Sequence, residues 1–226
     1  MASLLMKLLN RGKNQISRFH PKHMPKSLLW AQNAVGFINV EIAANELVPL
    51  TVPFDVLGSE EGTILFKDTE LAKAAQRGSV AYFWRNQGWK PVNALPTGGF
   101  NTTEVLQPGE CFFFKPSQAQ TYTLSGEVPS DGSISVSISG KGNLNAVGNP
   151  YPVSQAFKET ALAQSAKRGA IAYFWKEEGG WNPANALPSG GFNTSKILQP
   201  GEGFFYKSAT TEESGQWTES KPYEYP

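Results

Sequence analysis

The sequence has little of the residue types on which most catalytic and metal sites depend. Cys111 is the only cysteine, and His20 and His23 are the only histidines, among 226 residues. One cysteine cannot form an intrachain disulfide or a cysteine-based zinc cluster, and two histidines supply at most two metal ligands. Neither histidine has an acidic companion nearby, as a nucleophile-activating base requires. We therefore expect a non-enzymatic protein with no metal and no cofactor.

Long apolar runs are also missing. The segment "MASLLMKLL" is interrupted by Lys7, so it is a poor signal-peptide core. No stretch of about 20 apolar residues is present to cross a bilayer. Localisation stays open on these grounds, with a virion or a cell-surface assembly favoured.

Acidic residues are absent before Glu41, which leaves the first 35 residues as a basic arm. The rest of the chain is mildly acidic, with 14 basic against 19 acidic side chains. An arm of this kind suits contact with nucleic acid, an anionic membrane or an acidic neighbouring subunit. It is equally compatible with a solvated tail. Its six positive charges come from Lys7, Arg11, Lys13, Arg18, Lys22 and Lys26.

Glycine, proline and aromatic residues are plentiful. The chain has 22 Gly and 16 Pro, with 12% aromatic residues set among short apolar runs. This composition favours many short strands joined by tight turns over long helices. The fold is expected to be mainly β.

A repeat covers most of the chain. The phrase "NALPTGGFNTTEVLQPGECFFFK" from Asn93 returns as "NALPSGGFNTSKILQPGEGFFYK" from Asn185, with 17 of 23 residues identical. Upstream, "FKDTELAKAAQRG" parallels "FKETALAQSAKRG", and "GSVAYFW" parallels "GAIAYFW". The predicted organisation is a basic arm over 1–35 and two homologous, β-sandwich-like modules over 36–128 and 129–226.

Each unit predicts the same order of elements. A strand with period-2 alternation, "GFINVEI" or "SISVSIS", comes first. After a second short strand, "DTELAKAAQRG" predicts a short helix capped by Asp68 or Thr69 and stopped at Gly78. The second copy has Thr160 as cap and Gly169 as stop. An aromatic strand follows, "VAYFW" or "IAYFW".

A type II turn is predicted at the "QPGE" of each copy. Proline sets φ near −65° at the second position and glycine accepts a positive φ at the third. The segments "ECFFFK" and "EGFFYK" then leave the turn as strands.

An aromatic cluster is the best candidate for a binding site. Its rings could stack sugars or bases, with asparagines supplying hydrogen bonds. The same rings could instead fill the core, which is the expected use of aromatic strands in a small β-domain. Trp89 and Trp181 follow polar bends and are predicted to be the most exposed. The candidate ligand-binding residues are Trp89, Asn93, Phe100, Trp181, Asn185 and Phe192, beside Trp84 and Trp175.

The second unit resembles a module found in bacterial secreted and cell-surface proteins. The residues that carry the resemblance are "GNPYP", "AYFW…GW" and "LQPGEGFFYK". The likeness extends over 35–226, less closely at "TVPFD" in the first unit. It implies a compact β-rich module of sandwich type used in extracellular or assembly contexts, and no catalytic residue.

Two functions remain open. In the first, the chain is a structural subunit of a larger particle, a virion or a surface filament, that self-associates or docks its arm on a neighbour or on nucleic acid. In the second, it is a secreted or cell-surface module that binds a glycan through Trp89 and Trp181. The copies differ at Glu104 against Lys196 and at Cys111 against Gly203, and we expect them to face different neighbours. Cys111 is interpreted as a small buried residue.

Overall fold

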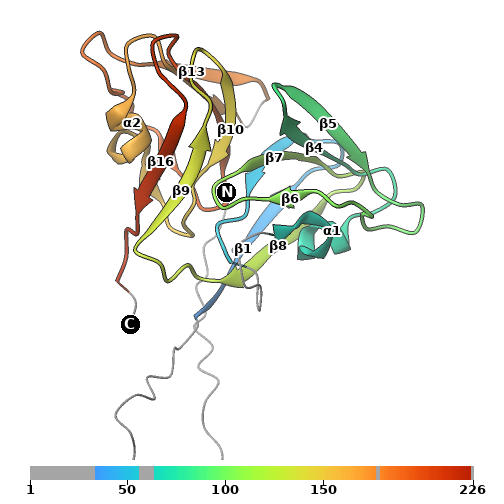
Figure 1. Ribbon diagram of the computed structural model, residues 1–226. Helices are drawn as coiled ribbons and strands as arrows, with labels where there is room; N and C mark the ends of the chain where they lie inside the picture. Colours follow the sequence, from blue (N-terminus) through green and yellow to red (C-terminus); the bar gives the residue numbers. More distant parts are fainter. Residues whose placement is uncertain (1–33, 56–63, 177–178, 225–226) are drawn as a thin grey trace, which may run out of the picture.

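The computed structural model describes residues 34–55, 64–176 and 179–224. The fold is mainly β, as predicted, with two modules of the same design (Figure 1). The arm residues Lys7, Arg11, Lys13, Arg18, Lys22 and Lys26 lie outside the described residues, as do both histidines.

The first module is a run of short strands interrupted by one 3₁₀ turn and one short helix. In chain order it contains β1 (Val35–Ile42), β2 (Val48–Thr51), β3 (Ile64–Leu65), η1 (Phe66–Asp68), α1 (Glu70–Ala74), β4 (Val80–Arg85), β5 (Gly88–Asn93), β6 (Val105–Leu106), β7 (Cys111–Lys115) and β8 (Gln120–Glu127).

The second module repeats this order element by element. It contains β9 (Ser133–Ile138), β10 (Leu144–Gly148), β11 (Gln155–Ala156), η2 (Phe157–Glu159), α2 (Ala161–Ser165), β12 (Ile171–Trp175), β13 (Trp181–Asn185), β14 (Ile197–Leu198), β15 (Gly203–Lys207) and β16 (Gly215–Ser220).

The sheets of the two modules have the same topology. A four-stranded antiparallel sheet has the order β2-β7-β4-β5 in the first module and β10-β15-β12-β13 in the second. A two-stranded sheet, β1-β8 or β16-β9, provides the other layer. The remaining short strands pair over two residues each, β3 with β6 in the first module and β11 with β14 in the second.

Period-2 alternation gives each four-stranded sheet two different apolar faces. In β4, Ala81 and Phe83 point into the core of the first module, where Phe83 stacks on Phe112. Tyr82 and Trp84 point to the opposite face, where they join a separate cluster. The strand is therefore apolar on both sides because each face of the sheet is covered.

The helices are shorter than predicted. Thr69 is the N-cap of α1, with its Oγ1 accepting from the Ala72 N–H at 3.1 Å, and Thr160 caps α2 in the same way. Helix α1 stops at Ala74 because Ala75 turns extended and its carbonyl accepts a hydrogen bond from Gly99 N (2.7 Å). The predicted stop at Gly78 is therefore several residues beyond the helix.

The type II turns are present in both copies. Glu110 N donates to Gln107 O at 2.9 Å and Glu202 N donates to Gln199 O at 3.1 Å. The glycines at the third positions have φ of 71° and 77°. Strands β7 and β15 leave these turns as predicted.

The two modules lie side by side, the first in blue to green and the second in yellow to red (Figure 1). Strand β8 ends at Glu127 and β9 begins at Ser133, so a short segment joins the modules. Helix α1 packs on β8 and α2 packs on β16, which puts the helices away from the contact between modules.

Candidate functional site

An aromatic cluster fills the contact between the two four-stranded sheets. Phe113 of β7 and Phe205 of β15 occupy equivalent positions and stack on each other, with ring centroids 5.9 Å apart. Trp84 and Trp89 of the first module contact Phe205 of the second at 5.3 and 5.6 Å. The equivalent tryptophans of the second module, Trp175 and Trp181, both contact Phe113 at 5.7 Å.

These contacts are reciprocal, so the repeats pair as a two-fold dimer would. In an isologous interface, residue i of one unit meets residue j of the other and the converse. The backbone follows the same rule, since Leu50 bridges to Glu202 and the equivalent Val147 bridges to Glu110. The modules therefore form one internal dimer.

Residues near the pseudo-two-fold axis are complementary in size. Gly203 lies against its own counterpart, Cys111, and a Cβ added to Gly203 would come within 3.0 Å of the Cys111 Cβ. Gly148 lies against its counterpart Thr51, and a Cβ there would meet Thr51 Cβ at 2.6 Å. In both pairs the second module supplies the glycine, and the first module supplies the larger residue that occupies the space beside it. Burial raises the pKa of the Cys111 thiol, which keeps it protonated and unreactive.

The two "QPGE" turns clasp the opposite module. Gly148 N donates to Gly109 O at 2.8 Å, and Thr51 N donates to Gly201 O at 3.0 Å. A Cβ on Gly109 would lie 2.5 Å from Val136 of β9, so each turn fits tightly into its neighbour. The predicted turn therefore also joins the two modules.

An open cavity of about 490 Å³ remains at the edge of this interface. We name it the aromatic pocket. Trp89 is its most exposed ring, with 45% of its surface accessible, and Trp84, Tyr173 and Trp181 are half-buried. Seven residues drawn from both modules line it: Trp84, Trp89, Leu144, Tyr173, Trp181, Phe205 and Lys207.

One wall of the aromatic pocket is fixed by hydrogen bonds between modules. Trp84 Nε1 and Gln87 Nε2 both donate to the Leu144 carbonyl at 3.0 Å, and Leu144 N donates to Gln87 Oε1 at 3.0 Å. Gln87 sits in the β4-β5 hairpin at φ of 61°, beside Asn86 at 51°. The side-chain amide of Gln87 thus bonds both the N–H and the C=O of Leu144, as the backbone of a neighbouring strand would. Gln87 itself has a positive φ, which non-glycine residues seldom adopt.

The charge reversal between copies is compensated inside each module. Arg85 pairs with Glu104 (3.1 Å) and with Glu110 in the first module. In the second, Lys196 replaces Glu104 and pairs with Glu202 at 2.5 Å. Glu110 and Glu202 therefore each have a cation in their own module, and the expectation that the reversal marks different neighbours stays a prediction.

The structure brings together some of the predicted ligand-binding residues and separates others. Trp89 and Trp181 come from different repeats and line the same cavity. Asn93 and Asn185 are exposed on β5 and β13. They share a sheet face with these tryptophans but lie four residues further along, about 13 Å by strand rise.

Phe100 and Phe192 do not belong to the site. Each is 7% exposed and packs in the core of its own module, 5.1 Å from Phe66 and Phe157 respectively. They lie across the sheet from the tryptophans, so the prediction of a shared platform is wrong for these two rings. Sequence reasoning missed Tyr173, Leu144 and Lys207, which reach the pocket only because the repeats pair.

The part of the chain that the structure describes has no group of three or more His, Cys, Asp or Glu side chains that could hold a metal ion. Among the same residues, no helix is long and apolar enough to cross a membrane.

Comparison with family models, with curated proteins and with solved structures found no match. The resemblance to the bacterial surface module therefore stays a prediction. Any function must be argued from the aromatic pocket itself.

Proposed function

We propose that this protein is a non-enzymatic, secreted or cell-surface module that binds glycans in the aromatic pocket. The observation that carries the proposal is the convergence of Trp89 and Trp181 on one cavity. Its volume falls in the usual range of small-molecule sites, about 300–1,000 Å³.

The lining suits the chemistry of a sugar. Aromatic rings offer large apolar faces to the C–H faces of a pyranose, while the ring edges stay polar. Trp89 has the accessible surface for such stacking. Lys207, exposed at the end of β15, supplies donors for sugar hydroxyl or carboxylate oxygens. Among the described residues, those that line the pocket include no carboxylate and no histidine, which supports binding without acid–base chemistry.

Neither module can make this site alone. Trp84 and Trp89 come from the first repeat, and Tyr173, Trp181 and Phe205 from the second. The residues to which the proposal assigns sugar contacts are therefore Trp89 and Trp181, with Asn93 and Asn185 placed for a neighbouring unit of a longer chain.

A glycan array tests the proposal with three proteins. The full chain is expected to bind a defined set of glycans, and Trp89→Ala with Trp181→Ala to lose that binding. Leu187→Ala is the control, because Leu187 is also an exposed apolar residue, at 40%, but does not line the pocket. Near-ultraviolet circular dichroism checks that each variant is folded. Absence of binding in the parent, or undiminished binding in a folded double variant, contradicts the proposal.

A second candidate is a structural subunit of a virion or surface filament, and a specific feature favours it. The first 35 residues carry six positive charges and no acid, which suits docking on an acidic neighbour, a nucleic acid or an anionic surface. Deleting them should leave the two modules folded and abolish assembly into particles. Equal assembly by the shortened chain, measured by light scattering, contradicts this candidate.

A further inference from the structure

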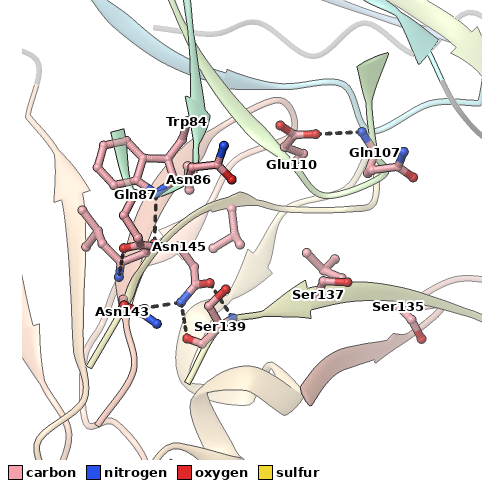
Figure 2. Close-up of a pocket in the computed structure, with 14 residues that line it drawn as sticks. Trp84, Asn86, Gln87, Gln107, Glu110, Ser135, Ser137, Ser139, Asn143 and Asn145 are labelled. Carbon is pink, nitrogen blue, oxygen red and sulfur yellow. Dashed lines mark hydrogen bonds between the residues drawn. The ribbon is translucent and has the colours of Figure 1, made fainter. Parts of the chain in front are cut away.

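A second hollow adjoins the aromatic pocket. It has a volume of about 520 Å³ and shares Trp84 and Leu144 with the pocket as a common wall. We name it the polar cleft. Figure 2 shows Ser135 and Ser137 of β9 on one side, Gln107 and Glu110 opposite, and Asn86 and Gln87 near Trp84 at one end.

The lining of the polar cleft is rich in uncharged donors and acceptors. The side chains of Asn86, Gln107 and Ser137 are exposed. None of these three side chains makes a hydrogen bond to another described residue, so their polar atoms are available to solvent or to a ligand. Glu110 is the one carboxylate among the lining residues. It accepts hydrogen bonds from Arg85 and from Gln107 N, so its charge is already compensated.

The wall between the two hollows consists of residues that are partly open to solvent. Trp84 and Leu144 are half-buried, and Gln87, which holds them together, is exposed. The three hydrogen bonds to Leu144 keep this wall in place. An elongated ligand can therefore have one end on the aromatic rings and the other among amides and hydroxyls.

We propose that the polar cleft is a second subsite for uncharged oligosaccharides, continuing the chain whose first ring stacks in the aromatic pocket. This rests on the proposed glycan-binding function. Amide and hydroxyl groups match the many hydroxyls of a sugar, which act as both donors and acceptors. An occupied aromatic pocket also fixes the next ring, so the second contact forms at a high effective concentration.

An extended peptide added to the edge of β9 that does not pair with β16 is the competing occupant. The structure disfavours it, because Asn145 already pairs with that edge. Its Oδ1 accepts from Ser139 N at 2.8 Å and its Nδ2 donates to Ser139 O at 3.0 Å. These bonds occupy the backbone groups that strand addition would use at that end.

Calorimetric titration with neutral cello-, xylo- and manno-oligosaccharides, from disaccharide to hexasaccharide, tests the subsite in the full chain. Affinity is expected to rise with chain length in the parent. Ser137→Tyr should fill the cleft and lower the affinity for long chains by about tenfold, while disaccharide binding is unchanged. Ser133→Tyr is the matched control, since Ser133 is exposed on the same strand but does not line the cleft.

Length-independent affinity in the parent, or full affinity for long chains in Ser137→Tyr, overturns the second subsite. Disaccharide binding in either case leaves the proposed function standing. If no saccharide binds, both the second subsite and the proposed glycan-binding function are overturned. If extended peptides bind and Ser137→Tyr blocks them, the cleft is a site for a peptide strand and the saccharide proposal is overturned.

Discussion

Gly203→Ala adds a single methyl group at the centre of the interface between the two modules. In Gly203→Ala, the new methyl group would lie 3.0 Å from the Cys111 Cβ, closer still to its Sγ, and 3.3 Å from Leu50 N. Cys111 is fully buried, so neither side can move away freely. Overpacking of this kind costs about 1–3 kcal/mol. At about 2 kcal/mol per M of urea, the unfolding midpoint should fall by about 1 M.

The exchange variant is the informative one. Cys111→Gly alone empties a buried position and frees the backbone, for a cost of about 2 kcal/mol. Combined with Gly203→Ala, it gives back the space that the new methyl group needs. The double variant should therefore be more stable than the sum of the single changes predicts, by about 0.5–3 kcal/mol. Urea unfolding followed by tryptophan fluorescence measures all three variants.

Gly215→Ala is the control for glycine replacement in a strand, because an added Cβ meets nothing within 4 Å there. Its stability should stay within about 0.5 kcal/mol of the parent. A neutral Gly203→Ala, or strictly additive single changes, would refute the packing of the two repeats against each other.

Three further outcomes follow from other contacts. Burial, with Asp131 and then Glu127 nearby, raises the pKa of Asp55 above its ordinary 3.8. This carboxyl group therefore stabilises the fold below pH 3.8, and that contribution is lost as the pH rises through the folded pKa. Asp55→Asn should raise the melting temperature at neutral pH and not in acid, and equal gains at both pH values would contradict this. Gln87→Gly should gain about 1 kcal/mol by removing the strain of the positive φ, and it should lose two hydrogen bonds of about 0.5–1.5 kcal/mol each. The free energy of unfolding, measured in urea, should therefore fall by up to about 2 kcal/mol. A clear rise in that free energy would contradict the role of the hydrogen bonds. Burial and then Glu219 raise the pKa of Tyr151 to about 12. In an absorbance titration its phenol should therefore stay protonated to about pH 11. Complete ionisation of the tyrosines of the folded protein by that pH would contradict the burial of Tyr151.

Much of the fold follows from local patterns in the sequence. Alternation in "GFINVEI" and "SISVSIS" predicts β1 and β9, and Pro108 followed by Gly109 predicts the type II turn. These predictions succeed because side-chain alternation and turn dihedral angles are properties of a few neighbouring residues. The helix end was misplaced because a tertiary hydrogen bond from Gly99 to Ala75, and not Gly78, decides where the chain leaves α1.

The candidate site was only partly predictable. Trp89 and Trp181 were identified from the repeat, but their meeting in one cavity depends on how the repeats pair, which no local pattern encodes. Phe100 was misassigned because its "GGF" context looks like a loop, whereas its ring enters the core against Phe66 and Phe114. Lys196 pairs with Glu202 as Arg85 pairs with the equivalent Glu110, and this similarity between the copies is visible only in the folded modules.

Duplication takes on a particular meaning in this structure. Trp84 and Trp89 of the first copy and Trp181 of the second line a single cavity, and the "QPGE" turns hydrogen-bond to the opposite copy. Residues at equivalent places differ in size and lie against each other, Cys111 with Gly203 and Thr51 with Gly148, and neither glycine has room for a side chain. A fused chain can specialise its halves in this way, whereas a dimer of identical modules cannot.

The number of ligand molecules bound per chain tests the central claim most directly. Isothermal titration of the full chain with a saccharide that it binds should give one site, because Trp89 and Trp181 belong to the same cavity. Either Trp89→Ala or Trp181→Ala alone should then remove the whole of the binding. Two sites per chain, each lost with only one of the tryptophans, would contradict the account.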